Sequence, residues 1–136
     1  MFEVLDHTAD IGLRARGATR EEMYAVAALA LQHIALDASE ARPAQEFEIS
    51  AEGPDEESLL VNFLSEALYL IDGRRIAIAR LAVERLSETQ ASARLWGEPR
   101  DPARHPPKLV VKGVTYHQLR VRQNADGWTA EVYLDI

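Results

Sequence analysis

Two stretches of this chain repeat apolar residues at helical spacing, while the segments around them alternate polar and apolar residues at every second position. This change of period constrains the fold more than any other feature, because a pattern with the helical period of about 3.6 residues cannot line one face of a strand. We therefore expect two amphipathic helices inserted among several antiparallel strands. The predicted fold class is α+β, a layered domain of mainly antiparallel strands.

The first helix is expected to begin at Thr19. Thr19-Arg20-Glu21-Glu22 matches a capping box, in which the threonine hydroxyl accepts a backbone N–H and the glutamate reaches back. The helix should continue to about Leu36, with an apolar stripe formed by Met23, Ala27, Ala30, Leu31 and Ile34.

The second helix is expected between Gly53 and Gly73. Pro54 and three acidic residues suit its first turn, and its apolar stripe is formed by Leu60, Phe63, Leu64, Ala67, Leu68 and Ile71. The acidic cluster from Glu52 to Glu57 also admits a cation site. We favour the other interpretation, in which these carboxylates complement the helix dipole.

Strands with one buried face are expected where apolar residues occupy alternate positions. The clearest segments are residues 11–16, 46–51 and 128–136. The turn Asn124-Ala125-Asp126-Gly127 joins the last of these to residues 119–122 and carries an Asp-Gly hairpin signal. The pattern predicts that the final strand buries the side chains of alternate residues through Ile136.

Three further segments are less regular. Residues 91–95 alternate weakly, and residues 76–86 fit either a helix or a strand, of which we favour the strand. Four prolines between Glu98 and Pro107 predict a surface loop, because proline has no N–H to donate within a sheet.

Length and composition limit the classes of function. The chain of 136 residues is 47% hydrophobic, which suits one compact domain spanning residues 1–136. Asp and Glu (22) outnumber Lys and Arg (15), and the net charge of −7 argues against unaided binding of a polyanion, so we expect any contact with nucleic acid to be indirect or through a metal. The absence of cysteine excludes thiolate zinc sites and thiol nucleophiles. No secretion leader or run of about 18 apolar residues occurs, which predicts a cytoplasmic protein without membrane contact.

The segment Asp6-His7-Thr8-Ala9-Asp10 connects two strand-like stretches and carries two carboxylates and an imidazole. Two carboxylates four positions apart in a bend can converge on one cation. The alternative is that Asp6 and Thr8 stabilise turns and Asp10 is solvated. The sequence leaves both interpretations open.

Two further groups of polar residues lie near the end of the chain. Lys112-Gly113-Val114-Thr115-Tyr116-His117 contains one of only two lysines beside thirteen arginines, which suggests a point charge for phosphate contact, although surface solubility is an equal alternative. Asp135 is followed by Ile136, whose main-chain carboxylate would add a second anionic group if the Ile136 side chain were buried. Such oxygen donors suit Mg²⁺, Ca²⁺ or Mn²⁺, but a fraying terminus is the alternative. His105 is expected to cap its proline-rich loop.

These segments together resemble the archease family over essentially the whole chain. The matching residues are Asp6 to Gly12, Gly97-Glu98 with Asp101 to His105, Lys112 to His117, and Leu134-Asp135-Ile136. Gly113 stands where alanine is common in the family, which adds backbone freedom but removes no functional group.

The resemblance implies a fold, a role and a set of site residues. Archeases activate the RtcB-type tRNA-splicing RNA ligase, promoting its GTP-dependent guanylylation and multiple turnover, and are not enzymes themselves. By position, the family's divalent-metal site falls on Asp10, Asp135 and Ile136, with Ca²⁺ or Mg²⁺, or else Mn²⁺, as the ion. The surface that meets the ligase would include Asp6, His7, Lys112 and His117, and RNA and GTP would be met only through the ligase.

Two other classes of function use the same residues. A stand-alone metal-dependent phosphoesterase would turn over substrate without a partner. A chaperone-like modulator of RNA-modifying enzymes would need the surface but not the metal.

Overall fold

The computed structural model describes residues 1–6 and 10–136, and within these ranges the chain forms seven strands and two α-helices. In chain order the elements are β1 (Phe2–Asp6), β2 (Asp10–Gly17), α1 (Arg20–Ala35), β3 (Gln45–Glu52), α2 (Glu56–Leu68), the π-helical turn η1 (Tyr69–Gly73), β4 (Ile76–Leu86), β5 (Gln90–Pro99), β6 (Gly113–Asn124) and β7 (Gly127–Asp135). The predicted α+β class is confirmed, and residues 76–86 are a strand.

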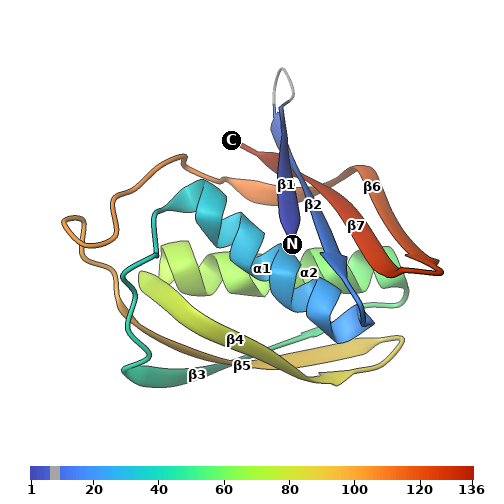
Figure 1. The fold of residues 1–136 in the computed structure, drawn as a ribbon, viewed down its shortest axis with the longest axis horizontal. Helices are drawn as coiled ribbons and strands as arrows, with labels where there is room; N and C mark the ends of the chain where they lie inside the picture. Colours follow the sequence, from blue (N-terminus) through green and yellow to red (C-terminus); the bar gives the residue numbers. More distant parts are fainter. Residues whose placement is uncertain (7–9) are drawn as a thin grey trace.

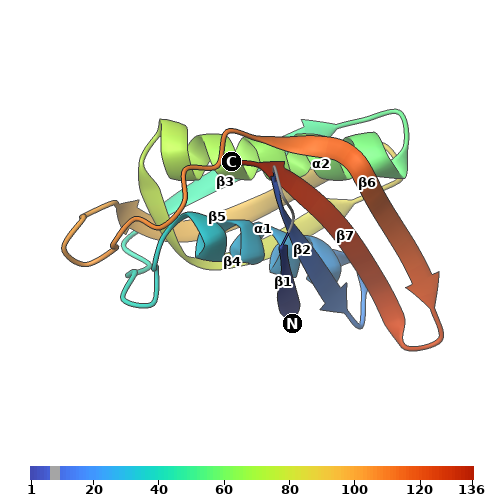
Figure 2. The same ribbon diagram turned by 90° about the horizontal axis from the view of Figure 1, so that it is seen from above.

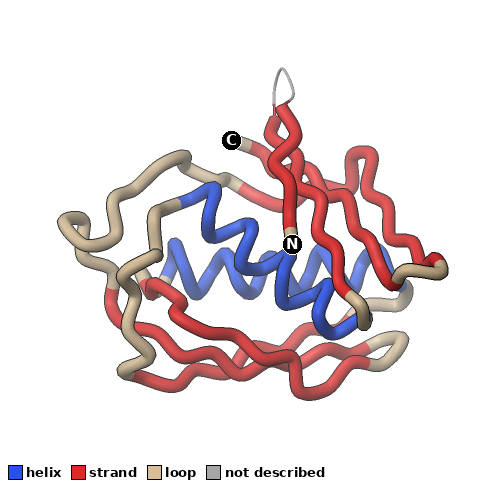
Figure 3. The backbone as a smooth tube through the Cα atoms, in the orientation of Figure 1, coloured by secondary structure: helices blue, strands red, loops and turns tan. Residues whose placement is uncertain are grey.

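Both helices lie between two antiparallel sheets (Figures 1 and 2). One sheet has the order β1-β2-β7-β6 and the other β3-β5-β4, and all strand pairs in them are antiparallel. Helix α1 packs against β2 and β4, and α2 packs against β3 and β6, so each helix contacts both sheets. Figure 3 shows the helices enclosed by strands, with the long loop after β5 running past one end of the layers. Each helix therefore contributes side chains to the core from two of its faces.

Helix α1 begins and ends as its sequence predicts. The Thr19 hydroxyl accepts the Glu22 N–H (3.1 Å), and the Glu22 carboxylate reaches back to the Ala18 N–H (3.3 Å). The expected apolar stripe is buried, but so are Tyr24, Ala28 and Ala35 on other sides of the helix. A single stripe was too narrow a prediction, because α1 is covered by sheets on two sides. None of the helices in the described ranges is long and apolar enough to cross a membrane.

The acidic first turn of α2 caps this helix and links it to α1. The Asp55 side chain is the N-cap and accepts the Ser58 N–H (2.8 Å). Glu56 accepts two hydrogen bonds from the Arg20 guanidinium (2.8 and 2.7 Å) and one from the Tyr24 hydroxyl (2.6 Å). Burial and this carboxylate raise the pKa of Tyr24. These two carboxylates therefore cap the helix and join it to α1, as the helix-dipole interpretation expects.

One local prediction needs correction and one is confirmed. The strand β5 extends to Pro99, inside the segment predicted as a loop, because β3 pairs with β5 only as far as Gly97 and Pro99 then faces one neighbour, β4. The predicted turn from Asn124 to Gly127 is present: Asn124 pairs with Gly127, and its two central residues are Ala125 and Asp126. Gly127 opens β7 with a φ of 132°, and a Cβ there would lie 2.4 Å from the Gly17 carbonyl oxygen, which explains why glycine follows the turn.

Candidate functional site

Two carboxylates predicted as metal ligands face each other across neighbouring strands. Asp10, the first residue of β2, is the cross-strand partner of Asp135, the last residue of β7. Directly opposed residues point to the same face of a sheet, with Cβ atoms about 5 Å apart. Asp10 is partly buried and its Oδ1 atom is inaccessible to solvent, whereas Asp135 is exposed. We call these two residues the carboxylate pair.

The Lys112 segment lies on the other side of Asp135. Gly113 begins β6 and is the cross-strand partner of Asp135, while the Lys112 backbone N–H donates to the Asp135 carbonyl oxygen (2.7 Å). The Lys112 side chain is exposed. Asp10 lies about a hundred positions before the segment from Lys112 to Asp135 in the sequence. The strands that carry these residues nevertheless meet at one end of the four-stranded sheet (Figure 2).

Tyr133 links His117 to this end of the sheet. Its ring lies over Gly12, where a Cβ would come within 2.8 Å of the tyrosine Cε2 atom, so this position of β2 requires glycine. The His117 ring meets Tyr133 edge to face, with 6.2 Å between centroids. Because Tyr133 and Asp135 are two positions apart on β7, His117 is brought onto the face that carries the carboxylate pair.

The structure gives less information on the other predicted site residues, which are Asp6, His7 and Ile136. Asp6 ends β1, where its backbone pairs with Ile11. His7 lies outside the described residues. Ile136 follows the last residue of β7 and is 38% exposed, so the expectation that its side chain is buried was wrong; the inward alternation ends at Leu134, which is fully buried.

The donor set at this edge suits a hard divalent cation. Carboxylate oxygens are the ligands that Ca²⁺ and Mg²⁺ prefer, and a cation bound between two opposed carboxylates would offset their mutual repulsion. In the part of the chain that the structure describes, no group of three or more His, Asp or Glu side chains gathers as metal ligands. A metal here would thus need the main-chain oxygen of Ile136, water or another molecule to complete its coordination.

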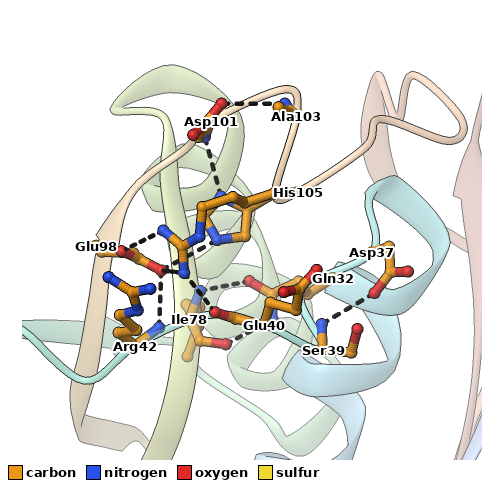
Figure 4. Close-up of polar contacts among 11 residues, drawn as sticks. Gln32, Asp37, Ser39, Glu40, Arg42, Ile78, Glu98, Asp101, Ala103 and His105 are labelled. Atoms are coloured by element: carbon orange, nitrogen blue, oxygen red, sulfur yellow. Dashed lines mark hydrogen bonds and ion pairs between the residues drawn. The ribbon is translucent and has the colours of Figure 1, made fainter.

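A second polar cluster, the Glu98 network, is buried beside the C-terminal end of α1 (Figure 4). Glu98 accepts hydrogen bonds from the Arg104 guanidinium (2.9 and 2.8 Å) and from the Arg42 backbone N–H (2.8 Å), and lies 3.1 Å from Nε2 of His105. His105 is 1% exposed, and its Nδ1 accepts the Asp101 N–H (2.9 Å). Because Nδ1 is an acceptor, Nε2 carries the proton and donates to Glu98. Arg104 is the main cause of a Glu98 pKa lowered to about 2.

Known proteins match this chain over nearly its whole length. A family model described as "Archease protein family (MTH1598/TM1083)" matches residues 2–136. The chain belongs to the archease family. Protein archease of Methanosarcina barkeri is 40% identical over 139 residues, covering 99% of this chain and 95% of that one. Protein archease of Pyrococcus furiosus is 37% identical, covering 99% of this chain and 98% of that one.

Two solved structures have the same fold as this chain. The solution structure of Methanobacterium thermoautotrophicum protein 1598 superposes with a TM-score of 0.77 at 30% identity, covering 99% of this chain and 98% of that one. A crystal structure from Thermotoga maritima, described as an archease and possible chaperone, has a TM-score of 0.64 over 97% of this chain and 94% of that one. At 19% identity the second likeness concerns the fold alone.

The segments that mark the chain as an archease gather in two places. Asp10, Lys112 and Asp135 meet at the sheet end, whereas Glu98 and Asp101 to His105 form the Glu98 network. His105 does cap its loop, as expected, but the burial of Glu98 was missed, because a glutamate beside a proline is usually exposed.

The Glu98 network positions the loop that leads to Lys112. From this network the chain runs along the end of α1, where the Pro106 carbonyl accepts the Asp37 N–H (2.9 Å) and the Lys108 N–H donates to the Ala35 carbonyl (2.9 Å). Gln32 fixes the same part of α1 to β4, exchanging two hydrogen bonds with the Ile78 backbone (2.7 and 2.9 Å). The network therefore acts through positioning: it holds a loop without regular structure in one path to the carboxylate pair.

Proposed function

We propose that this archease is a non-catalytic activator of an RtcB-type tRNA-splicing RNA ligase, promoting the ligase's GTP-dependent guanylylation and its multiple turnover. The observation that carries the proposal is the juxtaposition of Asp10, Asp135 and the Lys112 backbone at one sheet end. Membership of the family supports the choice of partner. The ligase would bind RNA and GTP, and this chain would meet it in the cytoplasm.

Within this proposal, the carboxylate pair and the main-chain oxygen of Ile136 hold a divalent cation, Ca²⁺ or Mg²⁺, or else Mn²⁺. Such a cation supplies charge neutralisation for phosphate oxygens. Asp10 is held by the β2–β7 ladder, and Asp135 is held by ladder pairs on both sides, from β2 and β6. The chain thus offers two anchored donors, while Lys112, His117, Asp6 and His7 would contact the ligase.

Calorimetry tests the metal part. Titration with Ca²⁺ or Mg²⁺ should show binding that weakens strongly in Asp10→Ala and in Asp135→Asn, because each variant removes a carboxylate donor. Glu48→Gln, which removes an exposed carboxylate on β3, is the matched control and should bind as the wild type does. Affinity unchanged by both Asp10→Ala and Asp135→Asn would rule this site out.

Kinetics test the activation part. Guanylylation of the ligase should accelerate in proportion to added archease, and the isolated archease should turn over neither RNA nor nucleotide. Turnover by the isolated chain, lost in Asp10→Ala, would instead identify a phosphoesterase.

A chaperone-like role is the second candidate; the Thermotoga maritima protein, whose fold this chain shares, is described as a possible chaperone. That role would need the surface but not the metal. Stimulation of the ligase, or of another RNA-modifying enzyme, that persists in Asp10→Ala and Asp135→Asn would favour it.

A further inference from the structure

Four arginines gather at one end of the outer face of the four-stranded sheet, whose other end carries the carboxylate pair, although the whole chain carries −7. Arg14 and Arg16 of β2 lie on one side of β7, and Arg120 and Arg122 of β6 lie on the other. These four arginines line a hollow of about 250 Å³ together with Asn124, Thr129 and Glu131. We call it the arginine groove.

The register of the strands builds the groove in two rows. Arg14, Glu131 and Arg120 are cross-strand neighbours in one row, and Arg16, Thr129 and Arg122 in the next. Strand geometry puts the rows about 7 Å apart and the arginines of β2 and β6 about 10 Å apart across β7. The groove therefore has the form of a channel along β7, with guanidinium groups on both walls.

A bulge in β6 is what turns Arg120 and Arg122 to this face. Thr115 pairs with Tyr133 and Arg120 with Glu131, so β6 advances five positions while β7 advances two. The three extra residues invert the alternation. Leu119 and Val121 consequently pack toward the core, and the two arginines point outward. Gln118, within the bulge, has a φ of 53°, a conformation that the inversion imposes.

The two walls differ in how their charges are used. Arg14 donates to Glu131 (3.0 Å) and Glu3 (2.8 Å), and Arg16 is also paired with Glu3. In the described parts of the chain, Arg120 and Arg122 make no ion pair, and both are exposed. Four arginines against two glutamates leave a local charge of +2, placed mainly on β6.

The lining favours a nucleic-acid backbone over a protein segment. Protein interfaces have an apolar centre, whereas the residues of the arginine groove are all charged or polar. Arginine forks accompanied by threonine and asparagine are the set that contacts phosphates. Two rows of arginines suit two successive phosphates better than one isolated anion. The net charge of −7 disfavours a duplex, whose phosphates are twice as dense as those of a single strand.

We propose that the arginine groove binds the phosphate backbone of single-stranded RNA. This departs from the expectation that RNA is met only through the ligase or a metal, because the local charge of the groove is positive although the net charge of the chain is negative. The proposed binding requires neither the ligase nor the metal. Binding is sequence-independent, because the groove offers phosphate contacts and no aromatic platform for bases.

The test is a titration of the isolated protein with a fluorescently labelled single-stranded RNA at low salt. The double variant Arg120→Gln/Arg122→Gln should bind at least about tenfold more weakly. The slope of its log Kd against log salt concentration should be smaller by about 1.4, which corresponds to the loss of two phosphate contacts. The matched control is Arg42→Gln/Arg85→Gln, two exposed arginines elsewhere, which makes the same change in net charge. It should weaken binding less than about twofold.

Three results would overturn the proposal. One is an absence of RNA binding by the wild type; another is an equal loss in the groove and control variants, which would assign binding to net charge. The third is equal, Arg120-dependent binding of a polyglutamate peptide, which would make the groove a site for acidic protein segments. If unlabelled RNA displaces the labelled RNA at a far lower concentration than inorganic phosphate does, the groove binds a nucleic-acid strand and not a single anion. Equal circular dichroism spectra show that the variants fold.

Discussion

Around Glu98, one buried carboxylate meets an arginine, a histidine and a backbone amide, whereas at the end of β2 and β7 two carboxylates occupy opposed positions. The first arrangement satisfies a charge that burial would otherwise penalise, and it holds the loop between β5 and β6. In the second, like charges lie directly opposite each other, an arrangement that destabilises a sheet unless other groups compensate it. The Glu98 network therefore serves the fold, and the contrast supports the proposal that the carboxylate pair serves binding.

The largest effect should come from beneath the carboxylate pair. Leu134→Ala truncates a fully buried side chain next to Asp135 and should lower the free energy of unfolding by about 2–5 kcal/mol. Urea denaturation measures this loss. Stimulation of the ligase should remain normal at temperatures where the variant is folded, and a defect there would mean that Leu134 does more than pack.

His105→Ala breaks the Glu98 network next. It removes the donor to Glu98 and the acceptor of the Asp101 N–H, and should cost about 1–3 kcal/mol by denaturation. The comparison is His117→Ala, which removes an exposed imidazole that meets the Tyr133 ring edge to face and should cost less, about 0.5 kcal/mol. Equal losses in the two variants would contradict the structural role of the network.

Lowering the pH should weaken the Glu98 network, because the Glu98 carboxylate becomes protonated. Its pKa is about 2 in the folded protein and 4.5 ordinarily, so its stabilising contribution is complete above pH 4.5 and disappears as the pH falls toward 2. The stability difference between the wild type and Glu98→Gln should therefore shrink across this window. Unfolding curves at several pH values measure it. The same comparison with the exposed Glu48→Gln should be flat, and a flat result for Glu98→Gln would disprove the assignment.

The smallest effect should have the opposite sign. In the presence of a chelator, Asp135→Asn should raise stability by about 0.5 kcal/mol, because it relieves repulsion within the carboxylate pair. Added Ca²⁺ should then stabilise the wild type and leave the variant unchanged. A variant less stable than the wild type without metal would show that Asp135 has a structural partner.

Much of the fold follows from local sequence signals. The capping box at Thr19, the alternation in residues 46–51 and the hairpin before Gly127 each predict an element that the structure contains. The local pattern did not predict the second sheet covering α1, nor the extension of β5 to Pro99, because both depend on which segments pair in space.

The site was predicted only in part for the same reason. The opposition of Asp10 and Asp135 requires the register of β2 with β7, which no local pattern specifies. Likewise, the bulge between Thr115 and Arg120 decides which face carries Arg120, and simple alternation would place it wrongly. The burial of Glu98 depends on Arg104 and Arg42 arriving from two different loops.

We expect the carboxylate pair to be needed for activation of the ligase but not for the stability of the fold. This expectation is tested most directly by the rate of ligase guanylylation measured with Asp135→Asn at a temperature where the variant is folded, beside His105→Ala under the same conditions. We expect Asp135→Asn to have a thermal midpoint no lower than that of the metal-free wild type and to lose stimulation. Lys112→Ala should likewise lose stimulation without losing its fold, whereas folded His105→Ala should stimulate like the wild type. Full stimulation by both Asp135→Asn and Lys112→Ala would contradict it.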